Sequence, residues 1–318
     1  MVRSVPDRTP ARRHAPDRGR DRRGLRHRAV AAAAGVLADL VAGEPPVRPH
    51  PVAAFGALMR TIEGAAYRDS RRAGAAHAAV GLALGAAAGA AVGSTAAATY
   101  LAVAGRALRQ VATDVGGALD RGDLDRARQL LPALVGRDCA GLGVAEVARA
   151  VVESVAENTV DAVVAPALWG AVAGAPGAFG YRAVNTMDAT VGHRGDRYGR
   201  YGWASARLDD AANLLPARCT AVLVAAVRPA AAPEVWRAVR HDAPAHPSPN
   251  SGVAEAAFAA ALGLRLGGAN RYGDRLEHRP PLGSGRAAAP GDIARACRLS
   301  LDVAVALAGA LAFAGVLG

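Results

Sequence analysis

Asn, Asp and Glu residues of this sequence that could do chemistry cluster in four short polar blocks, each beside an apolar stretch. The blocks cover residues 153–161, 185–188, 207–213 and 248–255. Asn, Asp and Glu side chains are costly next to lipid or an apolar core unless they are paired or functional. We therefore predict that these blocks form the active site and that the apolar stretches hold it.

The first block carries a stripe of carboxylates. On a helix, Glu153, Glu157 and Asp161 would lie at positions i, i+4 and i+8, one above another. Like charges at this spacing repel each other by a few tenths of a kcal/mol per pair, so Mg²⁺, an ammonium group or arginines should offset them. A solvated helix face would explain the same pattern. Because the stripe runs straight into the apolar residues 162–175, we predict a functional role for it.

The second and third blocks frame one polar stretch that mixes carboxylates, amides and arginines. If residues 203–215 are helical, Asp209 and Asn213 share one face, as do Arg207 and Asp210. Arginines suit phosphate recognition, and carboxylates suit a metal ion or an amine. A structural salt-bridge network explains these residues about as well, so the pattern alone leaves both interpretations open.

The fourth block, Ser-Pro-Asn-Ser-Gly at 248–252, is a turn before a predicted helix. Free backbone N–H groups at a helix start can hold an anion, although a plain N-cap is the alternative. The rigid polar turn around His50 has the same character. The sequence has no Walker, dinucleotide-binding or zinc-protease motif, so any phosphate would be bound without a standard loop.

Composition indicates the broad class. The chain has 318 residues, 52% of them hydrophobic but only 4% aromatic, so small aliphatic residues suited to packed helices dominate. The net charge is +11, and the sequence contains arginine but no lysine. Residues 1–28 are Arg- and Pro-rich, and we predict a disordered tail near anionic lipid. Without interleaved aromatics or a binding module, we expect no nucleic-acid partner. Three isolated cysteines argue against a disulfide framework and fit a reducing cytoplasmic setting.

Apolar segments must position the blocks. A bilayer core needs about 20 apolar helical residues. Two segments meet this need well, and three are shorter or interrupted. No run alternates with period two, so we expect few or no strands, and residues 279–286 are predicted to be a turn. We predict an all-α fold, a polytopic integral membrane helical bundle over residues 29–318. The apolar segments lie near 29–43, 73–105, 160–180, 214–233 and 299–318.

One of these segments carries a stripe of glycines. Gly81, Gly85, Gly89 and Gly93 follow each other at i+4 spacing, with His77 one turn before them. Such a stripe lets a second helix approach closely in lipid. Glycine costs about 1 kcal/mol each inside a water-exposed helix, which favours a packed membrane helix over a soluble Ala/Gly-rich one.

Five ordered segments resemble the CobD/CbiB family, the membrane-associated adenosylcobinamide-phosphate synthases of cobalamin biosynthesis. The resemblance covers the chain from about Ala29 to its C-terminus, and residues 1–28 lie outside it. The segments are LADLVAGEPPVRPHPVAAFGALM at 37–59, SVAENTVDAVVAP at 154–166, YRAVNTMDATVGHR at 181–194, GWASARLDDAANLLPAR at 202–218 and SPNSGVAEAAFAAALGLRLGG at 248–268.

The resemblance implies a reaction, namely ATP-dependent amide formation between adenosylcobyric acid and (R)-1-aminopropan-2-ol phosphate to give adenosylcobinamide phosphate. ATP with Mg²⁺ is the implied cofactor, and the corrinoid is a substrate. Membrane lipid is an implied partner, together with a helix–helix homo-oligomer or other cobalamin-pathway membrane enzymes. Such chemistry calls for Mg²⁺ ligands, cations for the phosphates and a base for the ammonium group.

We assign roles on that basis. The predicted catalytic residues are Glu153, Glu157, Asp161, Asp188 and Asp210, with Glu153 and Glu157 as Mg²⁺ ligands. The predicted substrate- and phosphate-binding residues are His50, Asn158, Asn185, His193, Arg194, Arg207, Asp209, Asn213, Arg218, Ser248, Asn250, Glu255 and Arg265.

The chain departs from the family pattern at a few positions. A glycine is expected after Asp161 and a methionine at position 190, where this chain has Ala162 and Thr190. A Lys-containing run is replaced by residues 193–197, HRGDR, which suggests that arginine stands in for lysine at a phosphate.

Topology adds a constraint. If all five apolar segments crossed the bilayer, the motifs at 181–213 and 248–268 would end on opposite faces. ATP is cytoplasmic, and one site needs its motifs together. We therefore expect 160–180 or 29–43 to be re-entrant or packed against protein, with the site at the cytoplasmic face of the cell membrane. The alternatives are a transporter or corrinoid-binding scaffold without catalysis, and a soluble all-helical enzyme.

Overall fold

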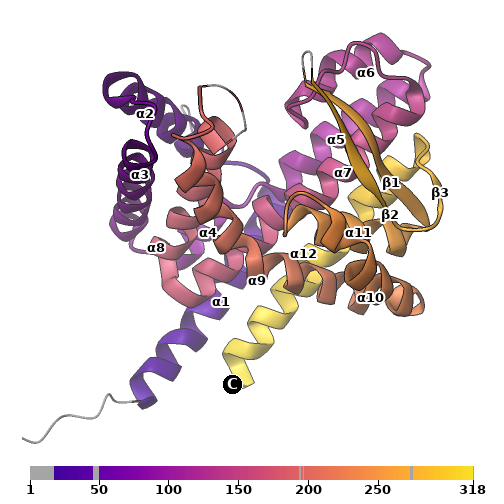
Figure 1. Cartoon of the computed structure of the whole chain (residues 1–318). Helices are drawn as coiled ribbons and strands as arrows, with labels where there is room; N and C mark the ends of the chain where they lie inside the picture. Colours follow the sequence, from indigo (N-terminus) through magenta and orange to yellow (C-terminus); the bar gives the residue numbers. More distant parts are fainter. Residues whose placement is uncertain (1–17, 46–49, 193–194, 196, 273–274, 318) are drawn as a thin grey trace, which may run out of the picture.

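The computed structural model describes residues 18–45, 50–192, 195, 197–272 and 275–317. These residues form a helical bundle with one small sheet (Figure 1), which confirms the predicted all-α membrane fold. The helices are α1 (Arg18–Ala42), α2 (Pro51–Ala66), α3 (Arg71–Val92), α4 (Thr95–Ala102), α5 (Gly105–Asp120), α6 (Leu124–Leu130), α7 (Val144–Thr159), α8 (Ala165–Met187), α9 (Trp203–Val227), α10 (Ala232–His241), α11 (Ser251–Leu262) and α12 (Gly291–Leu317).

Among the described residues, four helical stretches are long and apolar enough to cross a membrane. They are α3, the continuous helix Val144–Gly192, α9 and α12, and they coincide with four of the five predicted segments. The fifth, 29–43, belongs to α1, whose first half is rich in arginine. Because α1 begins at Arg18, the predicted disorder is wrong for residues 18–28. The rest of the predicted tail, 1–17, lies outside the described residues.

The predicted segment 73–105 is two helices rather than one. Helix α3 ends at Val92 because Gly93 adopts a left-handed conformation with φ of 69°, which glycine accepts without steric strain. Ser94 then caps α4 by accepting a hydrogen bond from the Ala97 N–H at 3.3 Å. A local capping signal thus overrides the uniform apolar composition.

The glycine stripe of α3 packs against α8 within the same chain. An added Cβ would lie 2.9 Å from Met187 Cε at Gly81, 2.5 Å from Ala183 Cβ at Gly85, and 2.7 Å from the carbonyl carbon of Ala175 at Gly89. A side chain at any of these three glycines would collide with α8. The close approach that the stripe predicts therefore occurs inside the chain, and a homo-oligomer would have to use another surface.

The helix that contains residues 160–180 is continuous but irregular. Helix α7 passes through a π-helical turn, η2 (Val160–Val164), into α8, which bends at Gly174 and Pro176 and ends in a second π-helical turn, η3 (Asp188–Gly192). Such π-turns often occur at functional sites. The apolar window of this helix is 61% buried, against 28–39% for the other candidate spans. The segment is therefore packed largely against protein, as the topological constraint requires.

A three-stranded sheet covers one side of α7 and α11. Its order is β2 (Arg275–Leu282), β1 (Leu264–Tyr272), β3 (Arg286–Ala287), with β1 antiparallel to β2 and parallel to β3. The prediction of a turn over 279–286 is wrong for 279–282, which belong to β2. The strands lack a period-two pattern because Gly267 and Gly268, with φ of 86° and 105°, shift the register. Two prolines in β2 are tolerated because it is an edge strand.

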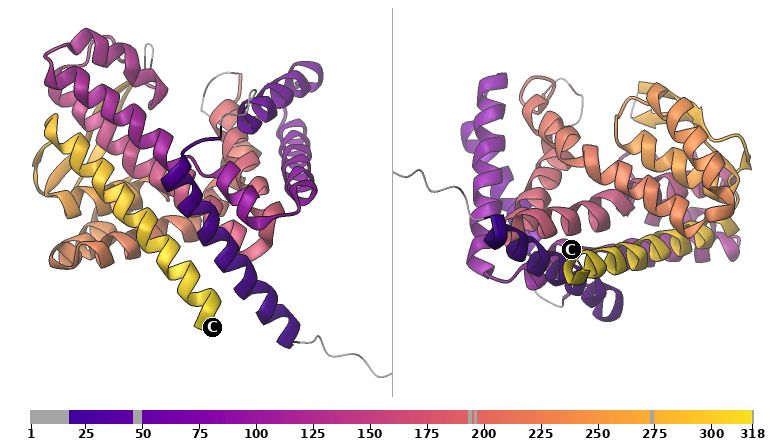
Figure 2. Two further views of the ribbon diagram at one scale, coloured as in Figure 1. Left: turned by 180° about the vertical axis from the view of Figure 1, so that it is seen from behind. Right: turned by 90° about the horizontal axis from the view of Figure 1, so that it is seen from below.

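Two groups of elements stand on either side of α9 (Figure 1). Helices α2, α3, α4 and α8 lie together, and α5, α6, α7 and the sheet form the other group. Helices α1 and α12 run alongside each other, and the first turns of α1 and the last turns of α12 project from the body at the same end (Figure 2). The core centres on α7, where Val147, Val151, Val152 and Val155 are fully buried.

Candidate active site

Residues from all four polar blocks line one cavity of about 1240 Å³. The cavity lies where the π-turns η2 and η3 and the start of α9 face the N-terminus of α11 and strand β2. This arrangement meets the expectation that the motifs come together in one place. The predicted residues that line it are Glu157, Asp161, Asp188, Asp209, Asp210, Asn213, Ser248 and Asn250.

One wall of the cavity is acidic. Asp161, on η2, lies 3.3 Å from the hydroxyl of Tyr181, which donates to Asn213 Oδ1 at 2.8 Å. Asp209 accepts hydrogen bonds from Asn213 Nδ2 at 3.0 Å and from Asn185 Nδ2 at 3.4 Å. These hydrogen bonds hold Asp161 and Asp209 in place, so the acidic wall is preorganised rather than freely solvated.

The rest of the acidic wall comes from Asp188, Asp210 and Glu157. Asp188 lies on η3 against Gly192, where an added Cβ would be 2.7 Å from the Asp188 Cγ. Asp210 forms an ion pair with the largely exposed Arg207 at 3.3 Å. Glu157 accepts a 2.7 Å hydrogen bond from Ser251 Oγ, which ties the acidic wall to the first residue of α11.

The N-terminus of α11 forms one end of the cavity. Ser248 Oγ accepts hydrogen bonds from the N–H groups of Asn250 and Ser251 at 3.3 and 3.2 Å. Asn250 donates to the Asp210 carbonyl at 2.8 Å and accepts from Arg218 Nη1 at 2.9 Å. Arg218 therefore holds Asn250 in place through this hydrogen bond. It does not line the cavity, where its predicted contact with phosphate would require it to be.

The opposite wall contains residues that the sequence did not single out. Arg137, Asp138, His246, Glu277, His278 and Arg279 line it. Burial and the nearby Arg279 lower the pKa of His246, so its ring is neutral near pH 7. Behind it, Glu255 is fully buried with Oε1 3.7 Å from His246 Nε2. Burial, with Glu153 and Glu157 nearby, raises the pKa of Glu255 well above its usual range. Nothing in the local sequence around Arg137 indicates a functional role.

The position of Glu153 differs from the one predicted for the carboxylate stripe. It does not line the cavity, and both of its oxygens are engaged by protein donors. Arg137 Nη2 lies 2.9 Å from Oε2, and the Gly267 N–H lies 2.9 Å from Oε1. Glu153 therefore faces the sheet rather than the cavity, and the predicted Mg²⁺ ligation by Glu153 and Glu157 does not fit this geometry.

Three further predicted residues, Asn158, Arg265 and His50, do not line the cavity. Asn158 donates to the carbonyl and hydroxyl of Ser154, Arg265 is exposed at the start of β1, and His50 caps α2. His193 and Arg194 lie outside the described residues.

Mg²⁺ can be tested against the donors present. In the described part of the chain, no group of three or more His, Cys, Asp or Glu side chains is arranged to hold a metal ion. Mg²⁺ commonly keeps several waters and binds through one or two carboxylates together with substrate phosphates. Glu157, Asp161, Asp188 and Asp210 offer such carboxylates, so the acidic wall fits an ion that arrives with a nucleotide.

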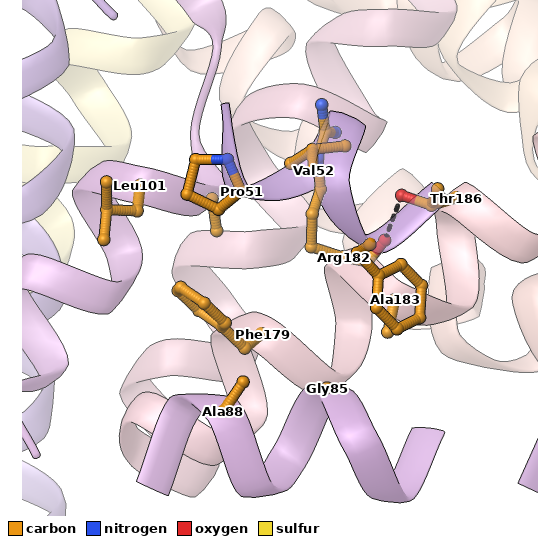
Figure 3. A pocket seen from close by; sticks show the side chains of 11 residues that line it. Pro51, Val52, Gly85, Ala88, Leu101, Phe179, Arg182, Ala183 and Thr186 are labelled. Carbon is orange, nitrogen blue, oxygen red and sulfur yellow. Dashed lines mark hydrogen bonds between the residues drawn. The ribbon is translucent and has the colours of Figure 1, made fainter. Parts of the chain in front are cut away.

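A second, smaller pocket of about 120 Å³ lies between α2, α3, α4 and α8 (Figure 3). Its lining is apolar apart from Arg182 and Thr186, whose hydroxyl donates to the Arg182 carbonyl at 2.7 Å. Arg182 Nη1 reaches the carbonyl of Asp161 at 3.4 Å and so lies behind the acidic wall. Pro51, the residue after His50, lines this pocket rather than the cavity, and residues 46–49 of the predicted turn lie outside the described residues.

Comparison with known proteins identifies the family. The family model described as CobD/Cbib protein matches residues 32–300. The chain belongs to the CobD/Cbib family. Cobalamin biosynthesis protein CobD of Mycobacterium tuberculosis (strain CDC 1551 / Oshkosh) is 48% identical over 86% of this chain and 91% of the relative. The proteins of the same name from Geobacter metallireducens and Klebsiella pneumoniae are 44% and 40% identical over 78% and 88% of this chain and 84% and 94% of the relatives.

The CobD/Cbib match confirms the resemblance drawn from the five segments, and it spans every residue that lines the cavity. No solved structure matches this chain.

Proposed function

We propose that this protein acts in cobalamin biosynthesis as an adenosylcobinamide-phosphate synthase. In this proposal it joins adenosylcobyric acid to (R)-1-aminopropan-2-ol phosphate in an ATP-dependent amide-forming reaction. The observation that carries the proposal is the cavity, which brings the carboxylates of the acidic wall together with a wall of arginines, histidines, Asp138 and Glu277 and with a helix N-terminus. The names of the relatives support the pathway.

The cavity suits the charges of this reaction. The carboxylate of the corrinoid would attack the γ-phosphorus of ATP and release ADP, and the amine nitrogen would then attack the activated carbonyl carbon and release phosphate. The amine must lose protons before and during this attack, and Glu157, Asp161 and Asp188 face the cavity as proton acceptors. Mg²⁺ bound with the nucleotide would neutralise charge on its phosphate oxygens.

Size and location support the same proposal. A cavity of about 1240 Å³ exceeds the range of about 300–1,000 Å³ typical of small-molecule sites, as a site for a corrinoid and two further substrates should. The four apolar helical stretches found among the described residues indicate a membrane protein. Because ATP is cytoplasmic, we propose that the cavity opens to the cytoplasmic face.

Product formation by purified protein in detergent tests the proposal. Wild-type protein with adenosylcobyric acid, ATP, Mg²⁺ and the amino-alcohol phosphate should yield adenosylcobinamide phosphate. Glu157→Gln and Asp210→Asn should lower turnover by about 10²-fold or more while the protein stays folded and membrane-bound. The exposed Glu234 provides the matched control, and Glu234→Gln should turn over normally. Near-wild-type turnover in both cavity variants would contradict the catalytic roles assigned to Glu157 and Asp210. Binding of the corrinoid without product formation would indicate a scaffold or transporter.

A further inference from the structure

Arg137 is an almost fully buried cation in the wall of the cavity. Its side chain is only 5% exposed, and a buried charge is costly unless it has partners. Nη2 donates to Glu153 Oε2 at 2.9 Å, and Nη1 donates to Asn270 Oδ1. Nε has no hydrogen-bond partner. A guanidinium carries five N–H groups, so these two bonds fix its position and leave donors for a ligand.

The groups behind Arg137 form a rigid support. The second oxygen of Glu153 accepts from the Gly267 N–H at 2.9 Å. Arg149 donates to the carbonyls of Gly267 and Ala269, the latter at 2.9 Å. The support depends on glycine at 268, where an added Cβ would lie 2.5 Å from Arg149 Nη1. Helix α7 and strand β1 are therefore joined at the point where they hold Arg137.

The surroundings of Arg137 on the cavity side favour an anion. Arg279 and His278 line the same wall, together with the carboxylates Asp138 and Glu277, and Ser248, Asn250 and Ser251 bring the N-terminus of the 12-residue helix α11 to the same cavity. A helix N-terminus carries a partial positive charge and suits phosphate. The carboxylates of the acidic wall come from the end of α7, from η2 and η3, and from α9.

We propose that Arg137 binds a phosphoryl group at this end of the cavity and that Glu153 is the positioning residue that holds it there. This inference rests on the proposed function, in which two substrates, ATP and the amino-alcohol phosphate, carry phosphoryl groups. It assigns Glu153 a role different from metal ligation. The oriented guanidinium presents a planar set of donors that matches phosphate oxygens.

Ligand binding without turnover tests this role. Purified wild-type and variant proteins are titrated separately with a non-hydrolysable Mg·ATP analogue and with (R)-1-aminopropan-2-ol phosphate. Arg137→Gln should weaken the binding of one of the two by about 10- to 100-fold, as expected for charged hydrogen bonds, and the affected ligand identifies the source of the phosphoryl group. Arg128→Gln, on α6 and away from the cavity, is the matched control. Unchanged binding of both ligands by folded Arg137→Gln would overturn the proposal.

Two further variants guard against a loss of folding. Asn270→Asp keeps an acceptor for Arg137 but adds a negative charge, so it should weaken phosphate binding several-fold without lowering the melting temperature. Under a purely structural role it would leave affinity unchanged. Glu153→Gln should raise KM for the affected substrate more than it lowers kcat. If wild-type protein binds phosphate through Arg137 but forms no product, the proposed function fails alone. If product forms while Arg137→Gln and Asn270→Asp bind normally, this inference fails alone.

Discussion

Replacing Gly192 by alanine should impair the acidic wall while leaving the fold intact. An added Cβ would lie 2.7 Å from Asp188 Cγ and closer still to its Oδ1, whereas ordinary contacts begin at 3.4 Å. The atoms in the way are the end of a side chain, so the carboxylate can turn aside by roughly 1 Å. A misplacement of about 1 Å can lower turnover by about 10²-fold. Alanine also gains up to about 1 kcal/mol of helix propensity over glycine, which offsets the local crowding.

We therefore expect Gly192→Ala to lower kcat by about 10²-fold and to shift the melting temperature by less than about 3 °C. Product formation and thermal melts in the same detergent measure both. Gly64→Ala is the control, because nothing lies within 4 Å of a Cβ added there. The double variant with Asp188→Asn should be no slower than Asp188→Asn alone, since both changes act on one group. Normal kcat in Gly192→Ala, or additive losses in the double variant, would refute this account of Asp188.

Two other predictions concern stability. Gly89→Val should destabilise the protein by about 1–3 kcal/mol, because the added atoms meet the backbone of Ala175; a melting temperature equal to that of wild type would contradict the packing described for α3 and α8. Glu255→Gln should stabilise it increasingly above pH 5. Burial and the nearby carboxylates raise the pKa of Glu255 in the folded protein above the ordinary 4.5. The protonated side chain therefore contributes fully to the stability of the wild type below pH 4.5, and this contribution is lost as the pH rises. Melts between pH 5 and 8 should show a widening gap from wild type, and a constant gap would count against it.

For the carboxylate stripe, residue spacing predicted the helical arrangement but not the surroundings of each side chain. Residues 153, 157 and 161 do lie on successive turns of one helix, as helical periodicity requires. Their environments differ because each turn meets a different neighbour. Glu153 meets Arg137 and strand β1, Glu157 meets Ser251, and Asp161 lies on a π-turn that inserts an extra residue into the helical repeat. Spacing along a helix predicts a shared face, but it contains no information about what covers that face.

The glycine stripe shows a similar division. Its spacing correctly predicts close helix packing, and the partner turned out to be α8 of the same chain rather than a second copy. The end of α3 at Gly93 and the bulge at Gly267 and Gly268 were not predicted. A positive φ depends on the path of the backbone, and helical glycines of this chain such as Gly81 and Gly85 do not adopt it.

The sequence by itself determined the helical class, the apolar stretches, the polar blocks and the family, because composition, periodicity and motif order are local properties. Only the tertiary structure decided that Arg137, His246 and Arg279 complete the cavity and that Glu153 faces away from it. These residues come from a turn, a loop and an edge strand whose positions depend on contacts between elements far apart in the chain. Long-range packing sets those positions, and no spacing within a single segment encodes it.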